Sequence, residues 1–107
     1  MDAMDRIKQA IDGNAVVIFM KGSPQAPQCG FSMRASQALT ACGVPYAHID
    51  ILADPEIRAT LPQYSHWPTF PQIFVNGELV GGCDIVIEMF NKGELQKLTQ
   101  AAATAKA

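Results

Sequence analysis

The sequence predicts an α/β protein in which helices flank a single four-stranded mixed β-sheet. Residues 15–51 show a strand period, then a helix period, then a strand period again, and such a crossover makes the two strands parallel. Residues 72–80 place an Asn-Gly pair between two apolar runs, the pattern of an antiparallel hairpin. The 107 residues, 49% of them hydrophobic, suffice for one domain with a core.

The chain is expected to open with an amphipathic helix. Met4, Ile7 and Ile11 recur at helical spacing, and Gly13-Asn14 supplies a C-terminal cap. The unbroken apolar run of residues 15–20 then predicts a strand that is buried on both faces.

A second helix follows a polar loop that contains two prolines. Gly43 ends this helix and Pro45 follows it, so residues 46–51 are expected to form the next strand. The apolar stripe of the helix consists of Phe31, Ala35, Ala38, Leu39 and Cys42.

A third helix is expected to begin at Asp54-Pro55-Glu56. This tripeptide combines a capping side chain, a proline with a preset φ and an acid in the first turn. Ile57 and Leu61 form its apolar side. Pro62 is expected to stop or bend the helix, which leaves residues 63–67 as an ordered loop.

Two short helices are expected after the hairpin. Asp84 is predicted to cap the first, which ends at Gly93, and the second begins near Glu94. Residues from about 100 onward are expected to fray. The predicted inward positions are Val86, Met89, Phe90, Leu95 and Leu98.

Composition excludes several classes of protein. A formal net charge of −2, without runs of like charge, argues against nucleic-acid binding. No signal peptide is apparent, and the apolar runs fall far short of the roughly 20 residues that span a bilayer, so no membrane association is expected. The three cysteines lack the spacing of a disulfide framework, which favours a reducing compartment and a cytoplasmic protein.

Cys29 is the strongest candidate for chemistry. It lies at the predicted start of the second helix, where free backbone N–H groups and the helix dipole stabilise an anion. With Lys21 at the other end of the loop, the thiol is expected to ionise below its free pKa of about 8.5. Three residues on, where dithiol redox motifs carry a second cysteine, the chain has Ser32, whose hydroxyl cannot resolve a disulfide.

The other two cysteines have weaker claims. Cys42 lies on the order of 20 Å from Cys29 along the helix axis, too far for a disulfide, and is expected in the core. Cys83 opens a predicted helix and is either another activated thiol or a small apolar residue. His48 and His66 have no partners at metal-ligand spacing.

Three segments carry a resemblance to a known family. Lys21-Gly22-Ser23-Pro24 followed by Cys29-Gly30-Phe31-Ser32 resembles the active-site segment of the monothiol glutaredoxins. Residues 67–72 and 81–84 are similar to that family's other signatures in order and approximate spacing. The likeness covers roughly residues 4–98. It implies one thioredoxin-like glutaredoxin domain over residues 1–107, with an added N-terminal helix.

The resemblance also implies a glutathione pocket. Cations at Lys21 and Arg58 match the family's site for the glycine carboxylate, and Asp84 matches a side chain that contacts the ligand. Pro71 corresponds to the cis-proline opposite the active cysteine, which turns the Phe70 backbone toward a bound peptide. The positions expected to bind glutathione are therefore Lys21, Arg58, Phe70, Pro71, Cys83 and Asp84.

A cluster carrier is the first function that the resemblance implies. A [2Fe-2S] cluster takes four thiolates in its common form, and this chain offers one well-placed sulfur. In the monothiol glutaredoxins, Cys29 from two chains and two glutathione thiols would bridge one cluster in a homodimer. Such a cluster suits transfer to recipient iron–sulfur proteins, and BolA-type proteins form cluster-bridged heterodimers with the family.

Two alternatives stay open. Cys29 would attack glutathione mixed disulfides in a thiol-disulfide oxidoreductase, with a second glutathione as the resolving thiol. The long loop between Lys21 and Cys29 is similar to that of the family's low-activity class, so this activity is expected to be weak. A redox-inert adaptor, in which Cys29 is dispensable, is the third reading.

Overall fold

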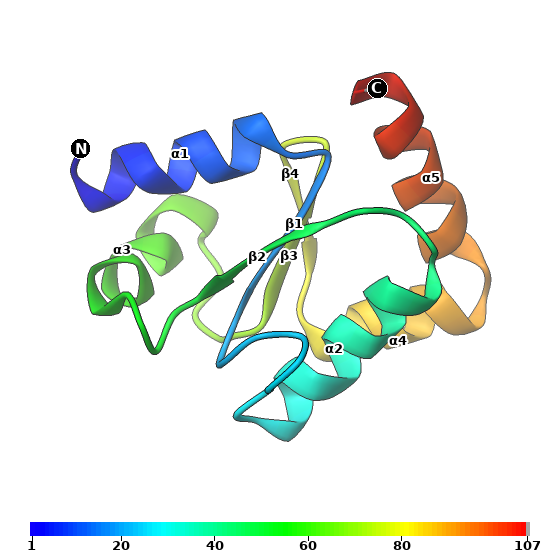
Figure 1. Ribbon diagram of the computed structural model, residues 1–107, viewed down its shortest axis with the longest axis horizontal. Coiled ribbons are helices and arrows are strands. Elements are labelled where there is room, and N and C mark those ends of the chain that lie inside the picture. The colour runs from blue at the N-terminus through cyan, green and yellow to red at the C-terminus, as the bar shows by residue number, and fades with distance from the viewer. Residues whose placement is uncertain (107) are drawn as a thin grey trace.

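The computed structural model describes residues 1–106 and contains one β-sheet between two layers of helices (Figure 1). The strands are β1 (Val16–Met20), β2 (Ala47–Asp50), β3 (Gln72–Val75) and β4 (Glu78–Gly81). The helices are α1 (Ala3–Gly13), α2 (Gly30–Ala41), α3 (Pro55–Ser65), α4 (Cys83–Asn91) and α5 (Glu94–Lys106).

The four strands lie in the order β2-β1-β3-β4. β1 pairs in parallel with β2 across the α2 crossover, whereas β1 with β3 and β3 with β4 are antiparallel. Asn76 and Gly77 both have positive φ, of 52° and 83°, as a two-residue hairpin turn requires. The predicted mixed sheet and its Asn-Gly hairpin are therefore confirmed.

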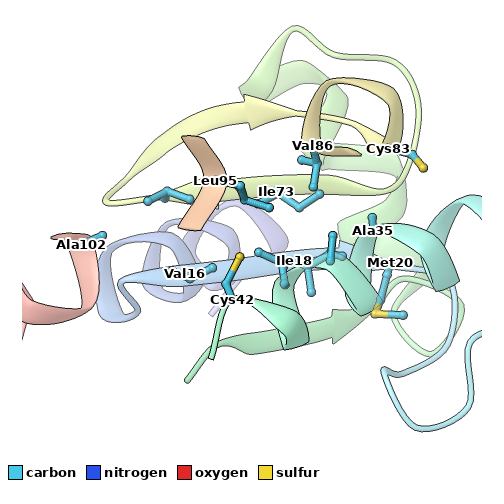
Figure 2. Close-up of a cluster of buried hydrophobic side chains, with 13 residues drawn as sticks. Val16, Ile18, Met20, Ala35, Cys42, Ile73, Cys83, Val86, Leu95 and Ala102 are labelled. Carbon is cyan, nitrogen blue, oxygen red and sulfur yellow. The ribbon is translucent and has the colours of Figure 1, made fainter. Parts of the chain in front are cut away.

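The alternation of side chains along β1 feeds two separate cores. All five residues of β1 are buried, as the unbroken apolar run predicted. Val17 and Phe19 pack against α1 and α3, while Val16, Ile18 and Met20 face α2, α4 and α5. Figure 2 shows the second of these cores, in which side chains of the sheet meet those of three helices.

Pro62 was expected to stop or bend α3. It does not stop the helix, which continues to Ser65. The proline removes one backbone donor, but packing retains the last turn. Leu61 is fully buried, the Tyr64 ring lies 6.4 Å from the Phe74 ring, and the His66 N–H donates to the Pro62 carbonyl at 2.9 Å.

The last two helices differ from the prediction in detail. Asp84 is not the cap of α4: Gly82 is the N-cap, its carbonyl accepts the Val86 N–H at 3.1 Å, and Asp84 lies in the first turn. Leu98 is 39% exposed, because Leu95 and Thr99 define the buried stripe of α5 instead.

The expected fraying from about residue 100 is also corrected, since α5 is helical as far as Lys106. Ala102 is buried in the second core, and the Gln100 side chain donates to the Cys42 carbonyl at 3.4 Å. These contacts hold the last turns against the body of the protein. Across the described residues, no helix is both long and apolar enough to cross a membrane.

Candidate functional site

Cys29 occupies the N-cap position of α2 in extended backbone conformation. Its carbonyl accepts the Met33 N–H at 2.9 Å, and its half-buried sulfur lies against the free N–H groups of the first turn. The pKa of the Cys29 thiol is lowered, above all because the Ser32 backbone N–H donates to the sulfur. The Phe31 N–H, the Lys21 charge and the Ser32 hydroxyl act in the same direction, while burial opposes them. The expected activation by helix start and lysine is therefore present.

The loop between β1 and α2 is folded on itself. The Gln28 N–H donates to the Lys21 carbonyl at 2.9 Å, and Gly22 forms an isolated bridge with Pro27. Gly22 has a φ of 88°, and a Cβ there would stand 2.4 Å from the Ala26 carbonyl oxygen, so only glycine fits. The folded loop therefore fixes the position of Lys21 relative to that of Cys29.

Two side chains anchor the start of this loop. The buried Ser32 hydroxyl oxygen accepts the Lys21 N–H at 3.1 Å, and the Asp50 carboxylate accepts the Gly22 N–H at 2.9 Å. Asp50 also accepts the Leu52 N–H at 2.9 Å. These bonds, led by that from Gly22, lower the pKa of Asp50. Asp50 was not predicted as a site residue, since only the parallel pairing of β2 with β1 brings it there.

A cleft of about 700 Å³ lies beside the cysteine, a size typical of small-molecule sites. The structure brings all six predicted ligand-binding residues to its walls, although they come from four separate segments of the chain. Cys29 itself does not line the cleft, but Phe31 of the same helical turn does. The lining residues are Lys21, Phe31, Arg58, Pro62, Trp67, Pro68, Thr69, Phe70, Pro71, Gly82, Cys83, Asp84 and Ile85.

One wall of the cleft is the loop of residues 67–71. The Phe70–Pro71 peptide bond is cis, as the resemblance implied. The fully buried Gln72 follows it, and its side-chain nitrogen donates to the carbonyls of Trp67 and Thr69. Trp67 also lines the cleft, which its place in the Trp-Pro-Thr-Phe-Pro-Gln motif did not predict.

The start of α4 forms the next part of the cleft. Cys83 and Asp84 both line it, and Asp84 is exposed. Cys83 is only 7% exposed and belongs to the core shared by α2 and α4 (Figure 2). Of the two readings left open for this thiol, the packing favours the small apolar residue.

The remaining candidates lie outside the cleft. Cys42, at the far end of α2, is buried as predicted, and burial raises the pKa of its thiol. Neither His48 nor His66 lines the cleft. Over residues 1–106, no group of three or more His, Cys, Asp or Glu side chains could hold a metal ion.

The geometry defines a class of protein: one of thioredoxin-like fold, with a cysteine at the start of the first crossover helix and a cis-proline loop that lines the cleft. Comparison with known proteins gives the family. Residues 16–80 match the family model described as Glutaredoxin. The chain is 54% identical to Glutaredoxin 4 of Haemophilus ducreyi over 104 residues, which cover 97% of each chain. It therefore belongs to the glutaredoxin family.

Solved structures agree with this assignment. A monomeric truncated mutant of Trypanosoma brucei 1-C-Grx1 is 42% identical, with a TM-score of 0.83 over 94% of this chain and 91% of that one. Buckwheat glutaredoxin, solved in complex with glutathione, is 27% identical, with a TM-score of 0.82 over 94% of this chain and 89% of the other.

Proposed function

We propose that this glutaredoxin binds glutathione in the cleft and, together with it, holds a [2Fe-2S] cluster for transfer in iron–sulfur cluster assembly. The observation that carries the proposal is the juxtaposition of one accessible thiol of lowered pKa with a cleft that presents cations and a helix start. Ser32 in place of a second cysteine supports a ligand role for Cys29 over a dithiol role.

The cleft is matched to the charges of glutathione, a tripeptide with two carboxylates and one ammonium group. Lys21 and Arg58 line it and would pair with the glycine carboxylate, in charge-assisted bonds that are stronger in a pocket than on an open surface. The free N–H groups at the start of α4 suit the second carboxylate, and Asp84 suits the ammonium. The Phe70 backbone would pair with that of the tripeptide.

The cluster would be the cargo of an assembly larger than one chain. Each chain would contribute the Cys29 thiolate and one bound glutathione thiol, so that a homodimer supplies the four thiolates of a common [2Fe-2S] centre. A BolA-type protein would replace one chain in a heterodimer. External ligands exchange more readily than four cysteines of one chain, which favours delivery to recipient iron–sulfur proteins. Free thiols and their chemistry suit a reducing cytoplasm.

Anaerobic cluster reconstitution with and without glutathione tests this proposal. We expect a visible absorption band, two irons and two sulfides per dimer, and dimeric mass in solution only when glutathione is present. An Arg58→Gln variant should need more glutathione for the same cluster content. Absence of a cluster under both conditions would contradict the carrier function.

A second function, reduction of glutathione mixed disulfides, is favoured by the accessible Cys29 thiolate. The thiolate would attack the glutathione sulfur of a mixed disulfide, releasing the substrate thiolate and leaving Cys29 bound to glutathione. A second glutathione thiolate would then attack that sulfur, which yields glutathione disulfide and restores Cys29. Turnover of a glutathionylated peptide well above the rate with free glutathione would establish this activity. If Cys29 proves dispensable for both activities in the folded protein, the protein would instead be a redox-inert adaptor.

A further inference from the structure

Gln72, the first residue of β3, has a polar side chain with no exposed surface. Buried amides are stable only when they are hydrogen-bonded. The Gln72 Nε2 donates to the Trp67 carbonyl at 2.8 Å and to the Thr69 carbonyl at 3.1 Å. A flipped amide would place its oxygen against both carbonyl oxygens, so the two donors fix the orientation of the side chain. The Gln72 Oε1 has no hydrogen-bond partner among the described residues, so the two donor bonds alone satisfy this amide.

These two bonds link the loop of residues 67–71 to a residue that does not itself line the cleft. The loop lines the cleft, whereas Gln72 does not. The Trp67 N–H donates to the Ser65 hydroxyl oxygen at 3.2 Å, so side chains hold both backbone groups of Trp67. Its buried indole nitrogen has no hydrogen-bond partner among the described residues, so the ring depends on these backbone anchors and on packing.

Gln72 also connects this wall to the strand that leads to Lys21. In the pairing of β1 with β3, Gln72 lies opposite Phe19, two residues before Lys21. Lys21 begins the loop that leads to Cys29 and lines the cleft. Gln72 therefore joins the Trp67 wall, through its side chain, to the strand that supports the cysteine loop, through the pairing of its backbone in the sheet.

We propose that Gln72 is a positioning residue, whose two amide donors hold the 67–71 wall in the conformation that shapes the cleft. Leu or Met would fill the same space but supply no donors, and Glu would place an acceptor against two carbonyl oxygens. Where ligand affinity is concerned, this inference rests on the proposed binding of glutathione. The conformation of the wall can be measured without any ligand.

The test compares wild type with Gln72→Met and Gln72→Glu. Trp67 is the only tryptophan in the chain, so its fluorescence and its quenching by acrylamide report directly on the wall. We expect a quenching constant at least about twofold higher in both variants, and roughly tenfold weaker binding of S-methylglutathione by calorimetry. In Gln72→Glu, affinity relative to wild type should partly recover as the pH falls, because a neutral carboxyl regains one O–H donor.

Thr99→Val is the matched control. It removes another buried hydrogen bond, from the Thr99 hydroxyl to the Leu95 carbonyl at 2.8 Å, away from the cleft. It should lower the melting temperature and leave Trp67 quenching and ligand affinity unchanged. Wild-type quenching in a folded Gln72→Met or Gln72→Glu protein overturns the proposal. A wild type that fails to bind S-methylglutathione removes the glutathione function, and quenching still decides the role of Gln72.

Discussion

Helix α2 is bounded by two cysteines, and the pKa values of their thiols are shifted in opposite directions. Cys29, at the N-cap, has its pKa lowered by the Ser32 backbone N–H, whereas burial raises the pKa of Cys42 at the C-cap. Cys29 is half-buried beside the cleft, and Cys42 packs in the core and hydrogen-bonds to Thr99. The same side chain thus has a lowered thiol pKa at one end of the helix and is a buried core residue with a raised pKa at the other.

The largest contrast between these two ends is expected in cluster binding. Cys29→Ser should lose all of the reconstituted iron and sulfide, because it removes the proposed protein ligand. Cys42→Ala should retain the cluster and lose only stability, since it deletes a buried sulfur. Iron and sulfide analysis after gel filtration measures both. A stable cluster in Cys29→Ser would remove this thiol from the ligand set.

Alkylation under native conditions should separate the two thiols without any cluster. We expect iodoacetamide to modify Cys29 about a hundredfold or more faster than Cys42, which requires opening of the fold. Because the thiolate is the nucleophile, the Cys29 rate should rise with pH and reach half of its limiting value below the ordinary pKa of 9.0. Mass spectrometry of digested samples gives both rates. Equal alkylation rates of Cys29 and Cys42 in the folded protein would contradict the expected difference between the two thiols.

A smaller effect is expected when one of the groups around Cys29 is removed. Ser32→Ala deletes the hydroxyl but keeps the backbone N–H, the main cause of the lowered pKa. One hydrogen bond contributes about 1 kcal/mol, so the pKa should rise and alkylation at neutral pH should slow roughly fivefold. Cys42 labelling after unfolding serves as the internal reference. An unchanged Cys29 rate would show that the hydroxyl does not act on the sulfur.

The smallest effect is expected at the anchor of the cysteine loop. The pKa of Asp50 lies below its ordinary value of 3.8, so the ionised carboxylate stabilises the folded state above that pH. This contribution falls away as the pH drops through the lowered value. Asp50→Asn should therefore melt roughly 4 °C or less below wild type at neutral pH, with the difference vanishing in acid. Thermal unfolding from pH 7 to pH 2 measures it, and a constant difference would exclude the linkage.

Much of the fold could be predicted because local signals and tertiary packing agree. The apolar run at β1, the Asp54-Pro55 helix start and the Asn76-Gly77 turn each specify one backbone conformation, and the structure has all three. The errors arose where packing overrides a local signal. Pro62 stays inside a helix because Leu61 is fully buried and Tyr64 packs against Phe74. In α5 the buried positions are Leu95 and Thr99, and Leu98 is left partly exposed.

The residues of the site also fall into those that local sequence predicts and those that only the tertiary structure reveals. Cys29 and Lys21 could be chosen from local sequence, because helix start and loop charge act over a few residues. Asp50 and Gln72 could not, since each acts on a segment that only the strand pairing or the loop geometry brings within hydrogen-bond distance. The six positions expected to bind glutathione came from the family resemblance, and the structure places these residues around one cleft.

The place of β1 in the sheet has a consequence for synthesis. Its parallel partner β2 follows after one helix, but its antiparallel partner β3 begins only at Gln72. A chain emerging from the ribosome therefore carries a fully apolar strand with one open edge until most of its length has been translated. The wall of residues 67–71 immediately precedes β3 in the chain, so the nascent protein carries the Cys29 segment well before it has a cleft.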